Sequence, residues 1–121
     1  MHSSAARLVV LAAASTALVL AAVLMPAELR PYAVTAIDYH FHDAHPTLPL
    51  ISGQDLVVTN QGRNLHNVTI PALGFSQDVP VGGRVTIEDI ADRLEPGRYQ
   101  MFCRIHLEAF GMKGVIVIAS E

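Results

Sequence analysis

Residues 99–117, YQMFCRIHLEAFGMKGVIV, contain two apolar runs: the chain's only cysteine ends the first, and a histidine and a methionine lie between this cysteine and the second. In the first run, Tyr99, Met101 and Cys103 fall on one side of a period-2 pattern, and residues 115–118 form a β-branched run. This pattern predicts a strand on each flank. Residues 104–114 must therefore turn, and the turn brings the three side chains together.

The side chains on this turn have the chemistry of metal ligands. Cys103, His106 and Met112 offer a thiolate, an imidazole and a thioether, and a trigonal copper site with two histidines, one cysteine and a weak axial methionine uses all three. Such a site needs a second histidine. His66, in the stretch NLHNVTIP, lies at the start of an alternating, strand-like run and is the candidate. The predicted metal ligands are therefore His66, Cys103, His106 and Met112.

These residues resemble the motif of the cupredoxins, the small blue copper proteins of the plastocyanin, pseudoazurin and amicyanin kind. In that family an upstream His, typically followed by Asn, joins a downstream Cys-x2-His-xn-Met loop. His66 with Asn67, and then Cys103, His106 and Met112, match this motif, and the resemblance covers roughly residues 33–119. One departure is that five residues separate His106 from Met112, which is one more than in the plastocyanin-like loop.

The resemblance implies a Greek-key β-sandwich that holds one type 1 copper ion and carries single electrons between redox partners. It also implies that the side chain at Asn67 hydrogen-bonds the site and ties its two segments together. Short strands with Pro and Gly between them, and no helix-length periodic segment, independently predict an all-β sandwich. Spacing alone does not distinguish a cupredoxin from an immunoglobulin-like sandwich.

The strand pattern can be followed along most of the chain. Residues 72–81 contain Gly74 and Pro80 without a convincing period and are expected to form a connecting loop, and residues 89–94 are expected to hold one helical turn. Strands are expected at residues 33–41, 54–60, 65–70, 84–88, 99–103 and 115–118.

The N-terminal part of the chain has the pattern of an export segment. Arg7 precedes residues 8–25, an 18-residue run without charge that ends at Pro26. Residues 1–27 are therefore expected to be a signal peptide or an uncleaved membrane anchor, and residues 28–121 the cupredoxin-like domain. A buried helix of a soluble fold is the alternative for the apolar run. Export places the domain in the periplasm or on the extracellular side of the cytoplasmic membrane.

Composition narrows the classes of partner. The formal net charge is −3 and the basic residues are scattered, so no nucleic-acid-binding patch is expected. Membrane contact is expected only through residues 1–27 if they are retained, and the domain is expected to be a monomer.

A single cysteine cannot form an internal disulfide, and in an oxidising compartment it needs burial or ligation. Cys103 could be a small buried hydrophobe, but the nearby histidine and methionine favour ligation.

The loop after His106 is mostly apolar although it should lie at the surface. Exposed apolar patches often mark contact sites. In the cupredoxins the edge of the downstream histidine emerges through such a patch, so a redox partner is expected to dock near His106, Leu107 and Phe110. The alternative is that Phe110 packs inward and closes the end of the sandwich.

A second group of histidines, His40, His42 and His45, suggests another metal site. His40 and His42 would point to one face of a strand. Because no further ligand is identifiable near them, a solvated strand edge is the favoured interpretation. Met101 shares the strand face of Cys103 and is expected to lie in the core rather than bind metal.

Two functions fit the predicted site. The first is an exported electron carrier, and the second is a copper-binding module that sequesters or delivers the metal without passing electrons. An enzyme is not expected, because a catalytic copper would need more histidines and an open position, and a cysteine hydrolase would need a base and an open cleft beside Cys103.

Overall fold

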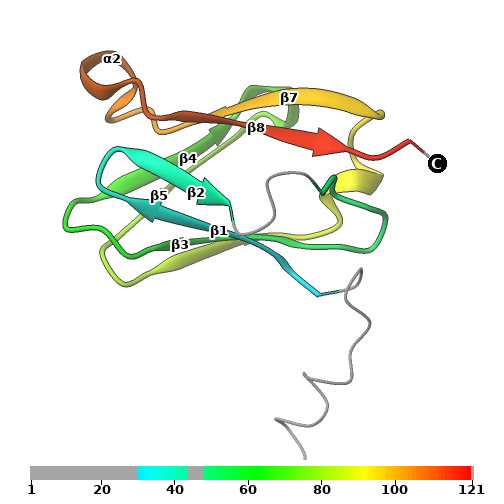
Figure 1. Cartoon of the computed structure of the whole chain (residues 1–121), viewed down its shortest axis with the longest axis horizontal. Coiled ribbons are helices and arrows are strands. Elements are labelled where there is room, and N and C mark those ends of the chain that lie inside the picture. Colours follow the sequence, from blue (N-terminus) through cyan, green and yellow to red (C-terminus); the bar gives the residue numbers. More distant parts are fainter. Residues whose placement is uncertain (1–29, 44–47, 121) are drawn as a thin grey trace, which may run out of the picture.

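The computed structural model describes residues 30–43 and 48–120, which fold into a sandwich of two four-stranded sheets. The expected export segment lies outside the described residues. The first sheet has the strand order β2-β1-β3-β6 and the second the order β5-β4-β7-β8 (Figure 1). The all-β sandwich expected from the sequence is therefore confirmed. Among the described residues, no helix is long and apolar enough to cross a membrane.

The first sheet mixes parallel and antiparallel pairing. Strand β1 pairs in parallel with β3 and antiparallel with β2, and β3 pairs antiparallel with β6. The bounds of these strands are β1 Tyr32–Ile37, β2 His40–Asp43, β3 Leu56–Asn60 and β6 Arg84–Ile87. Alternate residues of β1 and β3 are buried, so one face of this sheet covers the core.

All pairs in the second sheet are antiparallel. Its strands are β4 His66–Ile70, β5 Phe75–Val79, β7 Gly97–Phe102 and β8 Lys113–Ile118, and the short helices are η2 Pro71–Leu73, η3 Ile90–Asp92 and α2 Leu107–Phe110. Strand β4 is central, with β5 on one side and β7 on the other. This order places the start of β4 beside the end of β7, where the predicted ligand loop begins.

Two sequence predictions differ from the structure. The loop expected over residues 72–81 contains strand β5, whose three central residues are exposed and polar, so it shows no hydrophobic alternation. The strand expected over residues 33–41 is a hairpin, because Asp38 and Tyr39 form a turn between β1 and β2. Tyr39 has a φ of 76°, a left-handed conformation that favours glycine, so the residue type did not indicate the turn.

The core fills the space between the two sheets. Its residues come from both inner faces, and Cys103 and Met112 belong to it although they lie in the ligand loop. Asn60 is a fully buried polar residue at the end of β3. Its side-chain amide donates to the carbonyls of Asn64 and Val79, both at 2.8 Å, and its carbonyl accepts from the Gly62 N–H. These bonds anchor the β3–β4 connection just before His66.

Helix α2 and the C-terminal end of strand β8 lie at opposite ends of the sandwich (Figure 1). The β1–β2 turn and the β3–β4 connection are at the same end as α2. That end gathers segments from both sheets, and it is where the predicted metal ligands converge.

Candidate metal centre

The ligand loop is closed by its own main chain. His106 N–H donates to the Cys103 carbonyl at 3.2 Å, and Met112 N–H donates to the His106 carbonyl at 3.3 Å. Cys103 N–H donates to the Met112 carbonyl at 3.0 Å, so the two ends of the loop are bonded to each other. Between them α2 makes one turn and ends at Gly111, whose φ of 64° is the left-handed conformation that commonly ends a helix.

Three of the predicted ligands meet at this end of the sandwich. The potential ligand atoms of His66, Cys103 and His106 all lie within 4.8 Å of one another. His66 Nδ1 is 3.2 Å from His106 Nδ1, and Cys103 Sγ is 3.5 Å from the same nitrogen. Two nitrogens and one sulfur from two different strand ends thus face a common point.

Met112 lies beside this group. Its side chain is fully buried, and its main chain is hydrogen-bonded to both Cys103 and His106. The five-residue spacer is accommodated by helix α2, which returns the chain to the Cys103 end of the loop. The loop length therefore does not carry Met112 away from the group formed by His66, Cys103 and His106.

Burial differs among the ligands. Cys103 and His66 are fully buried, whereas His106 is partly exposed. Desolvation, with the neighbouring His106 as a second cause, lowers the pKa of His66 below its ordinary value. Burial thus favours the neutral imidazole, which is the form that binds metals.

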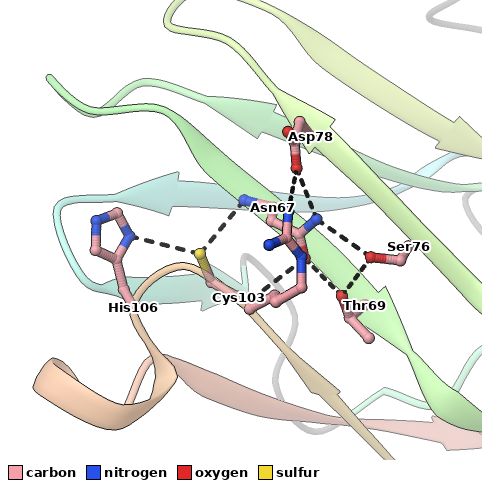
Figure 2. A network of polar contacts seen from close by, with 7 residues as sticks. Asn67, Thr69, Ser76, Asp78, Cys103 and His106 are labelled. Atoms are coloured by element: carbon pink, nitrogen blue, oxygen red, sulfur yellow. Dashed lines mark hydrogen bonds and ion pairs between the residues drawn. The ribbon is translucent and has the colours of Figure 1, made fainter.

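Asn67 connects the two segments that carry the ligands (Figure 2). Its backbone N–H points at Cys103 Sγ, 3.3 Å away, and its side-chain oxygen accepts from the Arg104 N–H at 3.2 Å. The side-chain amide donates to Asp78 Oδ1 at 2.9 Å, in strand β5. The same aspartate oxygen accepts from the Arg104 guanidinium at 3.2 Å. The network holds β4, β5 and the start of the ligand loop in one arrangement.

Two aromatic side chains surround His106. Tyr39 and Phe110 stack with ring centroids 3.7 Å apart and an interplanar angle of 10°. Both rings also meet the His106 imidazole edge-on, Tyr39 at 5.1 Å and Phe110 at 5.8 Å. Phe110 is 52% exposed, so it does not pack inward to close the sandwich.

A third segment of the site, the β1–β2 turn, was not predicted from the sequence. Asp38 and Tyr39 come from the opposite sheet, and Tyr39 contacts His106. Asp38 accepts a 2.9 Å hydrogen bond from the Arg63 N–H, which lowers the pKa of its carboxyl group. Aspartate is a common residue in turns, and Asp38 was the only feature of the sequence that indicated a turn at this position.

The second histidine group is only partly described. His40 and His42 are both exposed on β2, which is an edge strand of its sheet. His45 lies outside the described residues. A solvated strand edge remains the favoured interpretation of His40 and His42.

The donor set suits copper. A thiolate and a thioether are soft ligands, imidazole is a good ligand for copper, and a trigonal arrangement of two histidines and a cysteine with a weak methionine is that of type 1 copper. Structural zinc sites instead use Cys, His and carboxylates in tetrahedral sets. His66, Cys103 and His106, with Met112 beside them, fit a type 1 copper site.

Comparisons with known proteins agree with this geometry. A mutant of amicyanin in its reduced state is 18% identical, with a TM-score of 0.56 over 74% of this chain and 82% of that chain. An oxidised amicyanin mutant is 19% identical, with a TM-score of 0.58 over the same shares of the two chains. The Cu-containing nitrite reductase from Thermus scotoductus is 21% identical, with a TM-score of 0.57 over 75% of this chain but only 23% of that chain.

These structural likenesses show the fold. No curated protein sequence matches the chain. The family model described as the cupredoxin-like domain matches residues 6–118, which is most of the chain. The chain therefore belongs to the cupredoxin-like domain family.

Proposed function

We propose that this protein is an exported electron carrier with one type 1 copper ion, held by His66, Cys103, His106 and, axially, Met112. The observation that carries the proposal is the convergence of Cys103, His66 and His106, with ligand atoms within 4.8 Å of one another, at the end of a cupredoxin-like sandwich. Copper bound there supplies a reversible Cu(II)/Cu(I) couple.

The surrounding residues suit electron transfer because they hold the ligands in place. The main chain closes the ligand loop, and Asn67 bonds that loop to β4 and β5. Ligands fixed in this way move little between oxidation states. The Asn67 N–H directed at Cys103 Sγ withdraws charge from the sulfur, which favours the reduced, more electron-rich state.

Burial of Cys103 and His66 supports a carrier over an enzyme. A catalytic metal needs an open coordination position for substrate, and a nucleophilic cysteine needs access to one. Cys103 and His66 are both fully buried, and only His106 among the three reaches the surface. Electrons can pass through an exposed imidazole edge without any substrate entering the site.

The surface around His106 fits a docking face for a redox partner. Ile105 and Phe110 are exposed, and Leu107, which follows His106 in the sequence, is partly buried. Apolar side chains beside His106, the only exposed ligand, would let a partner approach the copper through an apolar surface of its own, without needing many charged groups. The domain acts as a monomer that meets its partner transiently, on the outer side of the cytoplasmic membrane to which residues 1–27 direct it.

Electrochemistry of the copper-loaded protein separates the two candidate functions. A carrier shows a reversible one-electron couple and fast exchange with small inorganic oxidants. A sequestration or delivery module exchanges electrons slowly whatever the partner. Irreversible voltammetry together with slow exchange would contradict the electron-carrier proposal.

Docking is tested with Leu107→Lys, which places a charge beside His106. Electron exchange with a redox partner is expected to slow while the copper absorption spectrum is unchanged. Val115→Lys is the control, because Val115 is exposed on β8 outside the ligand loop. An exchange rate that Leu107→Lys leaves unchanged would defeat the docking proposal.

A further inference from the structure

His66 has a buried nitrogen without a partner. The side chain is fully buried, and its Nδ1 faces the Cys103 and His106 side of the site. Its other nitrogen, Nε2, makes no hydrogen bond in the described structure. Buried polar atoms in proteins nearly always have a hydrogen-bond partner, and a metal-binding histidine almost always donates its second N–H to an acceptor.

The space next to Nε2 is bounded by Asp38. A Cβ placed on Gly62 would lie 2.9 Å from His66 Nε2 and 3.0 Å from Asp38 Oδ1. The imidazole and the carboxylate therefore face the same point, and only a glycine at position 62 leaves that point free. Asp38 is held there by the 2.9 Å bond from the Arg63 N–H, which follows Gly62 directly.

The turn that carries Asp38 is built in an unfavourable conformation. The next residue, Tyr39, has a φ of 76°, which costs energy for any residue with a Cβ. The turn lies beside both histidines of the site, since Tyr39 contacts the His106 ring and Asp38 faces the same point as His66 Nε2. The turn from the opposite sheet is thus placed against the metal site.

From this geometry we infer that Asp38 is a positioning residue whose carboxylate faces Nε2 of His66 across Gly62 and holds the imidazole proton on that nitrogen, which keeps Nδ1 of His66 bare for copper. The inference rests on the proposed copper site and adds to it an acidic residue from the β1–β2 turn. The contact between the two imidazoles agrees with this inference. His66 Nδ1 and His106 Nδ1 are 3.2 Å apart, and two ring nitrogens can share one hydrogen bond only when one of them lacks a proton.

A carboxylate in this position changes the properties of the metal. It makes the imidazole a stronger electron donor to the metal, and it places a negative charge near the ion. Both effects favour Cu(II) over Cu(I). Asp38→Asn keeps the size of the side chain and an acceptor for Arg63 N–H, but it removes the charge. We expect it to raise the reduction potential.

The size of the expected shift in reduction potential can be estimated from the usual effect of groups that interact with metal ligands. Loss of an outer-shell partner typically changes metal affinity by 10- to 100-fold, and solvent near the partly exposed Asp38 reduces this effect. A change of about threefold to tenfold in the ratio of Cu(II) to Cu(I) affinity corresponds to about 30 to 60 mV for a one-electron couple.

Asp92→Asn is a matched control. Asp92 also accepts a backbone N–H, from Gly53 at 3.1 Å, and the substitution removes the same charge. Asp92 belongs to η3, which is distant from α2 along the sandwich (Figure 1). Gly62→Ala is a second test, because the added Cβ would occupy the point that His66 Nε2 and Asp38 share. It is expected to weaken copper binding without removing any ligand.

The experiment measures the reduction potential of the copper-loaded wild type, Asp38→Asn and Asp92→Asn, and the ¹⁵N NMR signals of His66 in the metal-free proteins. We expect a higher potential in Asp38→Asn alone. The metal-free wild type should carry the His66 proton on Nε2. The resonance of this proton should move upfield in Asp38→Asn, because a neutral amide polarises the N–H bond less than a charged carboxylate does.

The outcomes separate this inference from the proposed function. A wild type without an intense blue absorption band would defeat the proposed copper site, while the metal-free NMR data would still test the role of Asp38. A blue wild type whose potential is the same in Asp38→Asn and Asp92→Asn would overturn the inference. A His66 proton found on Nδ1 in the metal-free wild type would overturn it as well.

Discussion

Asn67→Ala is the substitution that tests most sharply how the metal site is joined to the sandwich. The side chain is almost completely buried and makes four hydrogen bonds. Two of its partners, Thr69 and Ser76, keep a 2.9 Å bond to each other after the change, and Asp78 keeps its bond to the Arg104 guanidinium. The Arg104 backbone N–H loses its side-chain acceptor.

The expected loss of stability follows from this count. A typical hydrogen bond contributes about 0.5 to 1.5 kcal/mol, and a donor left unsatisfied in a buried site costs about 1 to 3 kcal/mol. Because part of the network re-forms, we expect Asn67→Ala to lower the free energy of unfolding by about 2 to 3 kcal/mol. The N–H to Cys103 Sγ bond belongs to the main chain, so the absorption spectrum of the copper site should persist while copper dissociates faster.

Urea denaturation of the metal-free proteins measures this effect, provided that the dependence on urea concentration keeps the same slope. Ser76→Ala is the control: it removes two bonds of the network at an exposed residue, leaves the Arg104 N–H bonded to Asn67, and should cost only about 0.5 to 1 kcal/mol. Asn67→Asp would place a carboxylate beside Asp78 and should be destabilising near neutral pH, with recovery on acidification. If Asn67→Ala and Ser76→Ala have the same stability, the network does not join the loop to the sandwich.

Three further predictions test other parts of the structure. Tyr39→Gly should be more stable than Tyr39→Ala by about 1 kcal/mol in urea denaturation, because the positive φ at this position favours glycine; the reverse order would contradict the turn conformation. The pKa of His66 is lower in the folded protein than in the unfolded chain, so protonation of this imidazole favours unfolding. The free energy of unfolding of the metal-free protein should therefore be constant above pH 6.5, the ordinary pKa of histidine, and fall as the pH drops below it. His66→Gln should flatten this pH dependence, and an equally steep loss of stability in that variant would assign the dependence to other groups. Met112→Leu should change the reduction potential while the blue band remains, whereas Met101→Leu, in the core two residues before Cys103, should not; equal potentials in the two variants would remove Met112 from the ligand set.

The ligand loop could be predicted from the sequence because its residue types are chemically specific. A lone cysteine followed by a histidine and a methionine between two apolar runs leaves few alternatives, and His66 precedes a clear strand pattern. The structure brings these residues to one end of the sandwich. Loop closure between Cys103 and Met112 depends on main-chain bonds that no residue pattern encodes.

Strand β5 could not be predicted because it lies at an edge and exposes three polar residues in succession. Such a strand is specified by its pairing with β4 rather than by periodicity. The role of the β1–β2 turn was hidden for a different reason. Tyr39 adopts a conformation that usually belongs to glycine, and Asp38 reaches the site only because β1 and β4 lie in facing sheets.

The central claim is that Cys103 binds copper together with His66 and His106. The direct measurement is a visible absorption and EPR spectrum after Cu(II) is added to residues 28–121, for the wild-type sequence and for Cys103→Ser. We expect an intense blue thiolate-to-copper band with narrow copper hyperfine splitting in the wild type, and its loss in the variant. A pale spectrum with ordinary hyperfine splitting that Cys103→Ser leaves unchanged would show that the cysteine is structural and would contradict the proposed site.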